Sequence, residues 1–307
     1  MKVLVTGGAG FIGSHIVDHL IAAGASVAVV DNLSTGREAN LNPQARFYNV
    51  DLTDPALREI LARERPEAVV HEAAQASVGV SVARPEADAE TNIQGTLNLL
   101  EAARLVGVRK VVYASSAAVY GEPAYLPVDE VHPVAPLSPY GVSKYTPELY
   151  LAAYRQLYGL DYVALRYANV YGPRQDALGE GGVIAIFAER LSRGEHLEVF
   201  GDGAQTRDFI HVEDVARANL KALESGSALI CNVSTGEPTS INDLVRLLAA
   251  VTGGDPAVSY QPAREGDIRH SRLDNLRARR YLDWTPIREL REGLEETLRF
   301  YAQNTLE

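Results

Sequence analysis

The stretch Gly7-Gly8-Ala9-Gly10-Phe11-Ile12-Gly13 decides the fold of this 307-residue chain. It separates an apolar run over residues 3–6 from a helix-like stretch over residues 11–23. Glycines between a strand and a helix permit a tight turn and bring backbone N–H groups close to a pyrophosphate, which the helix N-terminus attracts. The stretch therefore predicts a dinucleotide-binding turn. A surface turn that binds nothing is the plainer alternative, and the strand–turn–helix context argues against it.

The first half of the chain alternates between apolar runs rich in β-branched residues and helix-like stretches. The predicted strands cover residues 3–6, 26–30, 45–50, 68–71, 110–114 and 162–166. The predicted helices cover residues 11–23, 55–65, 87–106 and 140–158, with two more at 241–251 and 287–301 in the less regular second half. Such alternation predicts an α/β fold of the Rossmann type, a doubly wound parallel sheet with helices on both faces.

The change of pattern near residue 168 predicts two domains. We expect a dinucleotide-binding domain over residues 1–168, with residues 206–230 returning to it. Residues 169–205 and 231–307 are expected to form a smaller α/β domain that holds the substrate. Ligands of doubly wound sheets bind outside the carboxyl ends of the strands, so the smaller domain is expected to cover that edge.

Composition narrows the function classes. A net charge of −11 argues against a sequence-independent nucleic-acid binder, because attraction to phosphates needs positive charge. The single Cys231 excludes an intrachain disulfide framework and suits a reducing compartment. No apolar run approaches the ~20 residues of a membrane span, and a strand-like run begins at once, so we expect no membrane contact and a cytoplasmic location. The seven histidines show no metal-like spacing with acidic residues, and no metal is expected.

The end of the second predicted strand bears on cofactor choice. Asp31 follows that strand, 18 residues after Gly13. A carboxylate at this place accepts hydrogen bonds from ribose hydroxyls and repels a 2′-phosphate, which favours NAD over NADP. Arg37 lies six residues further on and keeps NADP open as an alternative.

A tyrosine and a lysine stand one helical turn apart at Tyr140 and Lys144, in a helix for which Ser138 is the expected N-cap. Ser116 follows the predicted strand over residues 110–114. A free tyrosine, with a pKa near ~10, is a poor base at neutral pH, but a nearby ammonium favours the phenolate. These residues point to proton transfer, although an amphipathic helix and an ordinary strand end can carry the same residue types.

The ordered segments GGAGFIG, DNLS, DLTD, HEAA, SSAAVYG, YGVSK and RYANVYGPR resemble the extended short-chain dehydrogenase/reductase family over nearly the whole chain. Within that family they are most similar to NAD-dependent nucleotide-sugar epimerases of the UDP-glucose/UDP-galactose 4-epimerase type. The resemblance implies transient oxidation of the sugar at C4 by tightly bound NAD, followed by reduction on the opposite face. It implies Tyr140 as the base, Lys144 as its partner and a ribose anchor, and Ser116 as a contact of the sugar hydroxyl.

The resemblance also implies two sets of binding residues. The cofactor set is Gly7, Gly10, Phe11, Ile12, Gly13, Asp31, Asn32, Asp51, Leu52, Ala73, Tyr140 and Lys144. The set for the UDP-sugar is Ser116, Tyr140, Asn169, Arg207, Arg264 and Ser271, in which the two arginines clamp the diphosphate and Ser271 gates the C2 substituent of the sugar. His71 is expected to be a packed strand-end residue rather than a ligand.

Several alternatives within and outside this family stay open. Dehydratases of the family carry Asp-Glu where this chain has Ala117-Ala118, which argues against water elimination. A UDP-glucuronate epimerase, a reductase or a decarboxylase remains an alternative to a UDP-hexose epimerase that also accepts N-acetylated sugars. A catalytically silent NAD-binding sensor would be expected to lack Tyr140, Lys144 or Ser116, and all three are present. The resemblance also implies a homodimer that pairs through the helices over residues 91–106 and 138–158. A tyrosine stripe at residues 150, 154 and 158 suits that interface or the core equally well.

Overall fold

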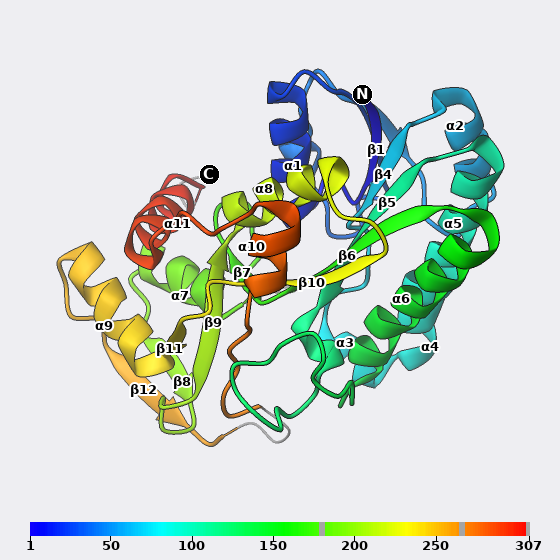
Figure 1. Cartoon of the computed structure of the whole chain (residues 1–307). Coiled ribbons are helices and arrows are strands. Elements are labelled where there is room, and N and C mark those ends of the chain that lie inside the picture. The colour runs from blue at the N-terminus through cyan, green and yellow to red at the C-terminus, as the bar shows by residue number, and fades with distance from the viewer. Residues whose placement is uncertain (178–181, 264–267, 305–307) are drawn as a thin grey trace.

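The computed structural model describes residues 1–177, 182–263 and 268–304. Its largest sheet consists of β1 (Lys2–Thr6), β2 (Ser26–Asp31), β3 (Arg46–Asn49), β4 (Ala68–His71), β5 (Lys110–Ser116), β6 (Asp161–Tyr167) and β10 (Leu229–Val233). These strands run in the order β10-β6-β5-β4-β1-β2-β3, and every pairing between them is parallel (Figure 1). The predicted α/β fold with a doubly wound parallel sheet is therefore confirmed.

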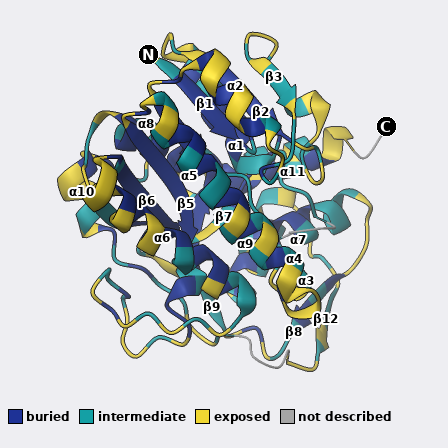
Figure 2. Cartoon of the chain, turned by 90° about the vertical axis from the view of Figure 1, so that its right-hand side faces the viewer, coloured by how far each residue is buried: buried dark blue, intermediate teal, exposed yellow. Residues whose placement is uncertain are grey.

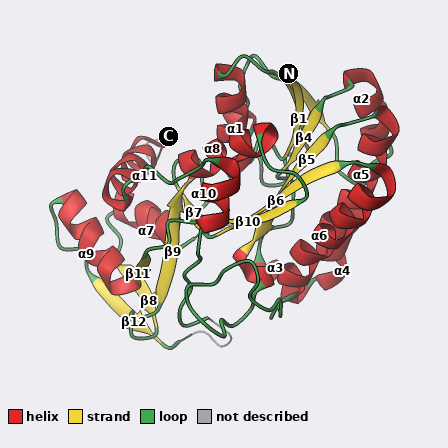
Figure 3. Ribbon diagram, viewed as in Figure 1, coloured by secondary structure: helices red, strands yellow, loops and turns green. Residues whose placement is uncertain are grey.

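Helices cover both faces of the large sheet, as Figure 3 shows. One layer holds α1 (Phe11–Ala22) and α8 (Val212–Glu224); the other holds α2 (Ala56–Glu64), α5 (Gly95–Val106) and α6 (Pro139–Tyr158). Alternate residues of β1 serve the two layers, because successive side chains of a strand point to opposite faces. Val3 and Val5 pack in the core that includes α1 and α8, whereas Leu4 packs in the core that includes α2 and α5. The apolar run over residues 3–6 is thus continuous because both faces of its strand are buried.

The second half of the chain adds two small sheets and a separate core. β7 (Asn169–Tyr171), β9 (Thr206–His211) and β11 (Pro238–Ser240) form one sheet, and β8 (Leu197–Phe200) pairs with β12 (Val258–Gln261). The helices of this half are α7 (Val183–Ser192), α9 (Ile241–Thr252), α10 (Leu276–Leu282) and α11 (Leu290–Asn304). Side chains from α7, α9, α11 and the small strands share one apolar cluster. In contrast, β10 is a strand of the large sheet, and α8 packs against that sheet.

The predicted single helix over residues 87–106 takes a different form. The chain forms α3 (Val78–Ala83), α4 (Pro85–Ala89) and a π-helical turn, Glu90–Gln94, before α5. The π turn carries Asn92, which is buried and faces α6, where its amide Nδ2 donates to the Ser143 hydroxyl at 2.9 Å. Its amide oxygen accepts the N–H of Gln75 at 2.8 Å. Such a turn adds one residue to the helix, and the 3.6-residue pattern of the sequence did not identify its place.

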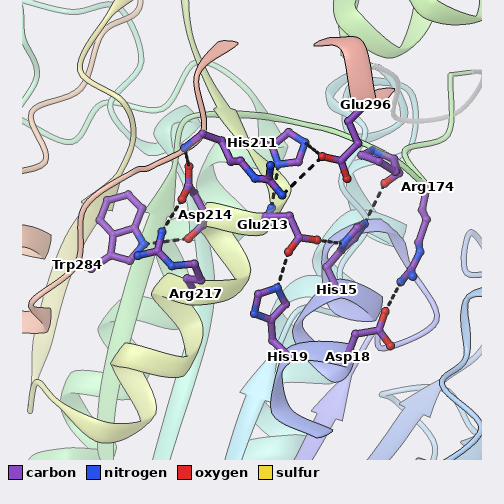
Figure 4. Close-up of polar contacts among 12 residues, drawn as sticks. His15, Asp18, His19, Arg174, His211, Glu213, Asp214, Arg217, Trp284 and Glu296 are labelled. Atoms are coloured by element: carbon purple, nitrogen blue, oxygen red, sulfur yellow. Dashed lines mark hydrogen bonds and ion pairs between the residues drawn. The ribbon is translucent and has the colours of Figure 1, made fainter. Parts of the chain in front are cut away.

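Helix α8 ties the N-terminal helix to the C-terminal part of the chain (Figure 4). The Glu213 carboxylate binds His15 at 2.7 Å and also His19, both on α1, and these hydrogen bonds lower the pKa of Glu213. On the other side of α8, the Asp214 carboxylate accepts the backbone N–H groups of Ile287 and Arg288 at 3.0–3.1 Å. The position of α1, and with it the glycine turn, is therefore fixed from behind by residues distant in sequence.

Helix α6 is held to the sheet by a buried ion pair. Arg166 on β6 donates from Nε to Glu148 Oε1 at 2.9 Å and from Nη2 to Oε2 at 2.6 Å. The Ser115 hydroxyl on β5 donates to the same Oε1 at 2.6 Å. Both charged side chains are almost inaccessible, at 3% and 1% exposed. A two-point contact of this kind fixes both the distance and the rotation of α6 against β5 and β6.

Glu148→Gln is expected to lower the free energy of unfolding by about 3–5 kcal/mol, because it leaves the buried Arg166 guanidinium without its charged partner. The matched control is Glu295→Gln on α11, whose partner Arg291 lies 3.3 Å away with both side chains about half exposed. That change is expected to cost less than about 0.5 kcal/mol. Urea denaturation of the two variants tests the difference, and equal losses would contradict the assigned role of the buried pair.

Candidate active site

The glycine turn leaves a helix N-terminus open to an anion. Gly7 adopts φ 72° and donates its N–H to Val30 O at 2.8 Å, which places the turn directly over β1 and β2. A Cβ on Gly13 would lie 2.1 Å from Gly7 O, so only glycine allows the helix to start this close to the turn. Gly10 is the N-cap of α1, and no side chain caps this end. The first N–H groups of α1 are therefore available to a phosphate.

One cavity crosses the carboxyl edge of the large sheet from this turn to the start of α6. Among the residues in its wall are Gly7, Gly10, Phe11, Ile12, Gly13, Asp31, Asn32, Asp51, Leu52, Ala73, Ser116, Tyr140 and Lys144. The structure thus brings together every cofactor residue implied by the resemblance, and Ser116 with them. Residues from six different strand ends meet here because parallel strands all end at the same edge.

Asp31 holds the shape of one end of this cavity. Its carboxylate is buried and accepts the Ala9 N–H at 3.0 Å with Oδ2 and the Leu33 N–H at 2.8 Å with Oδ1. Each carboxylate oxygen keeps a further lone pair for an outside donor such as a ribose hydroxyl. Arg37 is turned to Asp176 at 3.4 Å, so its guanidinium already has an acidic partner.

Asp51 is the second carboxylate at this end. Burial alone would raise its pKa, but the N–H and hydroxyl of Thr53 and the Asn32 amide bind the carboxylate and lower the pKa below its ordinary value. Asn32 Nδ2 lies 2.6 Å from Asp51 Oδ2, which links the ends of β2 and β3. This end of the cavity is therefore acidic and rich in acceptors, a match for hydroxyl and amine donors.

The other end joins Ser116 to the N-terminus of α6. Ser138 is the N-cap, as expected, and its hydroxyl accepts the Gly141 N–H at 3.1 Å. A Cβ on Gly141 would lie 2.7 Å from Ala118 O, so α6 begins in close contact with the turn after β5. In that turn Ser116 Oγ accepts the Ala118 N–H at 3.1 Å, which leaves the hydroxyl hydrogen to be donated.

Lys144 is buried, and its Nζ lies 5.0 Å from the centroid of the Tyr113 ring. Tyr113 in turn donates its hydroxyl to Lys144 O at 3.1 Å, which anchors the first turns of α6 to β5. His71 lies buried beside this group, between the hydroxyls of Thr6 at 2.7 Å and Thr96 at 2.8 Å. Burial, and then the charge of Lys144, lower the pKa of His71 to about 3, so this histidine is neutral.

Two residues in the wall of this cavity were missed by the sequence reasoning. Glu72 follows β4 directly, between His71 and Ala73, and accepts the Tyr167 hydroxyl at 2.8 Å. Tyr167 ends β6 and lines the same cavity. The signal that could have found Glu72 is its charge at the carboxyl end of a buried strand, a position where ligands of this fold bind.

A second cavity lies on the other side of β7. Asn169 and Arg207 both line it, whereas Ala168 and Val170 line the first cavity, so alternate residues here face the two cavities. Arg207 Nη1 also donates to Thr206 O at 2.9 Å. Phe200, Gln205 and the Arg190–Glu198 ion pair (2.8 Å) stand in the same wall and were not predicted.

Of the remaining two residues predicted to bind the substrate, the structure describes only Ser271. Ser271 is half-buried next to the strand that carries Arg207, and its N–H donates to Thr206 O at 3.1 Å. Arg264 lies outside the described residues. Within residues 1–177, 182–263 and 268–304, no group of three or more His, Cys, Asp or Glu side chains is placed to hold a metal ion, and no helix is long and apolar enough to cross a membrane.

Taken together, an uncapped helix behind a glycine turn, an acidic strand end and a Ser–Tyr–Lys group in one cavity define a Rossmann-fold enzyme that uses a nicotinamide dinucleotide. The chain belongs to the NAD-dependent epimerase/dehydratase family, whose model matches residues 3–234.

Solved structures of similar proteins span the whole chain. A UDP-glucose 4-epimerase from Thermotoga maritima, crystallised with UDP-glucose, is 49% identical, with a TM-score of 0.97 and 100% of both chains covered. A UDP-glucose 4-epimerase from Thermus thermophilus in complex with NAD is 46% identical, with a TM-score of 0.93 and 98% of this chain and 99% of that chain covered. A UDP-N-acetylglucosamine 4-epimerase from Methanobrevibacter ruminantium in complex with UDP-N-acetylmuramic acid is 40% identical, with a TM-score of 0.94 and 99% and 98% covered.

Proposed function

We propose that this protein is an NAD-dependent UDP-glucose 4-epimerase that interconverts UDP-glucose and UDP-galactose. The observation that carries the proposal is that Ser116, Tyr140 and Lys144 stand in the wall of the same cavity as the glycine turn and Asp31. A cofactor that spans this cavity would place its reactive end beside a potential base. The full-length similarity to UDP-glucose 4-epimerases supports the same assignment.

The residues of the first cavity fit NAD. We assign the N–H groups at the start of α1 to the pyrophosphate, Asp31 to the adenosine ribose, and Asp51 and Leu52 to the adenine. The close approach that Gly13 permits is the kind of cradle a pyrophosphate needs, since a side chain at this position would strike Gly7. NAD held by these residues would supply the hydride chemistry of the reaction, an oxidation of the sugar at C4 followed by reduction on the opposite face.

The chain's own residues supply the proton chemistry. Tyr140 takes the proton from the 4-hydroxyl of the sugar and gives it back to the new 4-hydroxyl, so there is no net proton change. Lys144 favours the phenolate form of Tyr140 through its positive charge and also holds the nicotinamide ribose. Ser116, whose hydroxyl hydrogen is not used by the Ala118 contact, binds the reacting sugar oxygen.

The UDP group is assigned to the second cavity. Asn169 and Arg207 line it, and the neighbouring residues Ala168 and Val170 line the cofactor cavity. A diphosphate bound at Asn169 and Arg207 would therefore lie close to the cofactor cavity, into which the attached sugar is proposed to reach. Arg207 and Arg264 are proposed as the diphosphate clamp, because a guanidinium pairs with phosphate oxygens at two points. In this arrangement residues 1–168 and 206–230 serve mainly the cofactor, and 169–205 and 231–307 mainly the substrate.

A second candidate function is epimerisation of the N-acetylated pair of sugars. Ser271 is small and its N–H donates to Thr206 O, next to Arg207, so its side chain would obstruct a substituent at C2 of the sugar less than a bulky residue would. A relative at 40% identity is a UDP-N-acetylglucosamine 4-epimerase. Ala117 and Ala118 in place of an acidic pair disfavour a dehydratase, because they offer no acid to protonate a leaving hydroxyl.

A second copy of the chain is proposed to pack on α5 and α6, which lie on the face turned toward the viewer in Figure 2. This face exposes Leu105, Leu149 and Leu157 by 55–68% of their surface. The expected tyrosine stripe is divided: Tyr154 is buried and donates to Glu101 at 2.6 Å, whereas Tyr158 is 52% exposed. Burial of such an apolar helix face drives association of proteins.

Leu157→Asp is expected to convert a dimer to single chains, because a charge in an apolar interface loses its hydration without a partner. The matched control is Leu276→Asp on α10, a residue that is 66% exposed on a different part of the molecule. Sedimentation equilibrium gives the mass of each species. A wild-type protein of single-chain mass, or a Leu157→Asp protein that stays dimeric, would contradict the proposed interface.

The proposed reaction is tested by incubating the purified protein separately with UDP-galactose, UDP-N-acetylgalactosamine and UDP-glucuronate, with no NAD added, and resolving the products by chromatography. UDP-glucose is expected from the first, and the 4-epimer of the second if Ser271 admits the acetamido group. Tyr140→Phe is expected to lower turnover by a factor of about 10²–10⁴ while NAD stays bound. No 4-epimer from any sugar would overturn the proposal, and a requirement for stoichiometric reduced cofactor would indicate a reductase.

A further inference from the structure

Glu72 is a carboxylate in the cofactor cavity for which the proposed reaction has no use. It is half-buried, and it lines the cavity together with Tyr140 and Lys144. One of its oxygens accepts the hydroxyl of Tyr167 at 2.8 Å, although β5 lies between β4, which Glu72 follows, and β6, to which Tyr167 belongs. It therefore belongs to the end of the cavity where the sugar is expected to react, not to the Asp31 end.

Asn219 and Tyr167 form a chain of hydrogen bonds that ends with a donor to the Glu72 carboxylate. Asn219 on α8 is fully buried, and its Nδ2 donates to Val215 O at 3.0 Å and to Tyr167 Oη at 2.8 Å. The Val215 carbonyl can only accept, so it fixes which way the Asn219 amide points. Because Tyr167 Oη already accepts from Asn219, its own hydrogen is directed to Glu72. The Glu72 carboxyl group is thus held in place in the cavity wall, and it can accept a hydrogen bond in its ionised or its protonated form.

The charged surroundings of Glu72 come from several elements. Lys144 on α6 is the positive group that acts on Glu72. The titratable hydroxyls of Tyr167 on β6 and Tyr113 on β5 interact with its charge, and Tyr140 on α6 lines the same cavity. Burial raises the pKa of Glu72 to about 7, against the lowering effects of the Tyr167 hydrogen bond and Lys144. Its carboxyl group thus changes charge near neutral pH.

His71, next to Glu72 in sequence, does not compensate for that change. Thr96 donates its hydroxyl to Asn92 O at 2.6 Å, so it accepts from Nε2 of His71. Burial and the charge of Lys144 lower the pKa of His71 to about 3, so the ring is neutral and its Nδ1 accepts from the Thr6 hydroxyl. Among the described residues that line the cavity, Glu72 and Lys144 are the charged side chains at this end, and Asp31 and Asp51 are those at the other.

We propose that Glu72 couples the binding of a proton to the redox state of the bound nicotinamide ring. The ionised carboxylate favours the oxidised, positively charged ring, and the protonated carboxylic acid favours the reduced, neutral ring. The inference rests on the proposed occupation of this cavity by NAD. No atom passes between Glu72 and the cofactor, and the carboxylate acts through its field alone. Glu72 is accordingly a positioning residue for charge and not a catalytic residue.

The direction of the effect follows from linkage. A positive ring near Glu72 lowers its pKa, so binding of NAD releases a proton when the carboxyl group of the free protein is protonated. The affinity for NAD should therefore rise with pH up to the pKa of Glu72 in the free protein. NADH carries the same pyrophosphate but a neutral ring, so the ratio of the two dissociation constants isolates the effect of the ring charge.

Ionisation of Tyr140 would give a pH dependence of the same sign, so the test uses Tyr140→Phe as its background. The dissociation constants of NAD and NADH are measured by calorimetry at pH 6, 7 and 8 on cofactor-free protein, without any UDP-sugar. In Tyr140→Phe, the ratio of the NADH constant to the NAD constant is expected to rise on the order of tenfold from pH 6 to pH 8. Adding Glu72→Gln, which keeps an acceptor for Tyr167, is expected to leave that ratio constant within about twofold.

The matched control adds Glu224→Gln at the exposed end of α8, which removes the same charge far from the cavity and is expected to retain the tenfold rise. If the Glu72 variant does not fold, Tyr167→Phe in the same background removes the donor and is expected to move the pH midpoint upward. A flat ratio in the Tyr140→Phe protein, or a rise that survives Glu72→Gln, would overturn the proposal. Loss of epimerase activity alone would not affect this test, because it uses only cofactor binding.

Discussion

The geometry of the whole site depends on the buried pair of Glu148 and Arg166. Tyr140 and Lys144 project from the first two turns of α6, and Ser116 projects from the end of β5, so their separation is set by how α6 lies on the sheet. Glu148 sits one turn beyond Lys144 and binds β6 through Arg166 and β5 through Ser115. A buried pair of charges contributes little net stability, because desolvation offsets attraction. The pair instead fixes the orientation of α6, because both charged hydrogen bonds can form at only one rotation of the helix.

Much of the fold was predictable from sequence for a simple physical reason. Strands buried on both faces appear as short continuous apolar runs, and such runs mark β1, β2, β4, β5 and β6. The edge strand β3 is only partly buried. The π turn at Glu90–Gln94 was not predicted, since no residue type marks the place of a single extra residue within a helix. The addition of β10 to the large sheet and the packing of α8 beside α1 also depend on contacts distant in sequence, such as the hydrogen bonds of Glu213 to α1.

The candidate site was predictable where function imposes a residue type at a fixed place along the chain. Gly13 and the Tyr140–Lys144 pair are of this kind, and each lies in the cavity wall. Glu72 was missed because its significance arises only from Tyr167 and Asn219, which are 95 and 147 positions away in the chain. Asp31 shows a third case: its position favoured NAD, but its part in holding the glycine turn through Ala9 emerged only from the structure.

In the proposed reaction the sugar is oxidised and then reduced at C4 without leaving the protein, while it lies between Tyr140 and the cofactor. The most direct measurement uses UDP-galactose that carries deuterium at C4 and follows the product by NMR and mass spectrometry in ordinary water. The account predicts that the UDP-glucose formed retains the deuterium at C4, because the hydride removed from C4 is the one returned. Loss of the label to solvent, or its appearance at another carbon of the sugar, would contradict it.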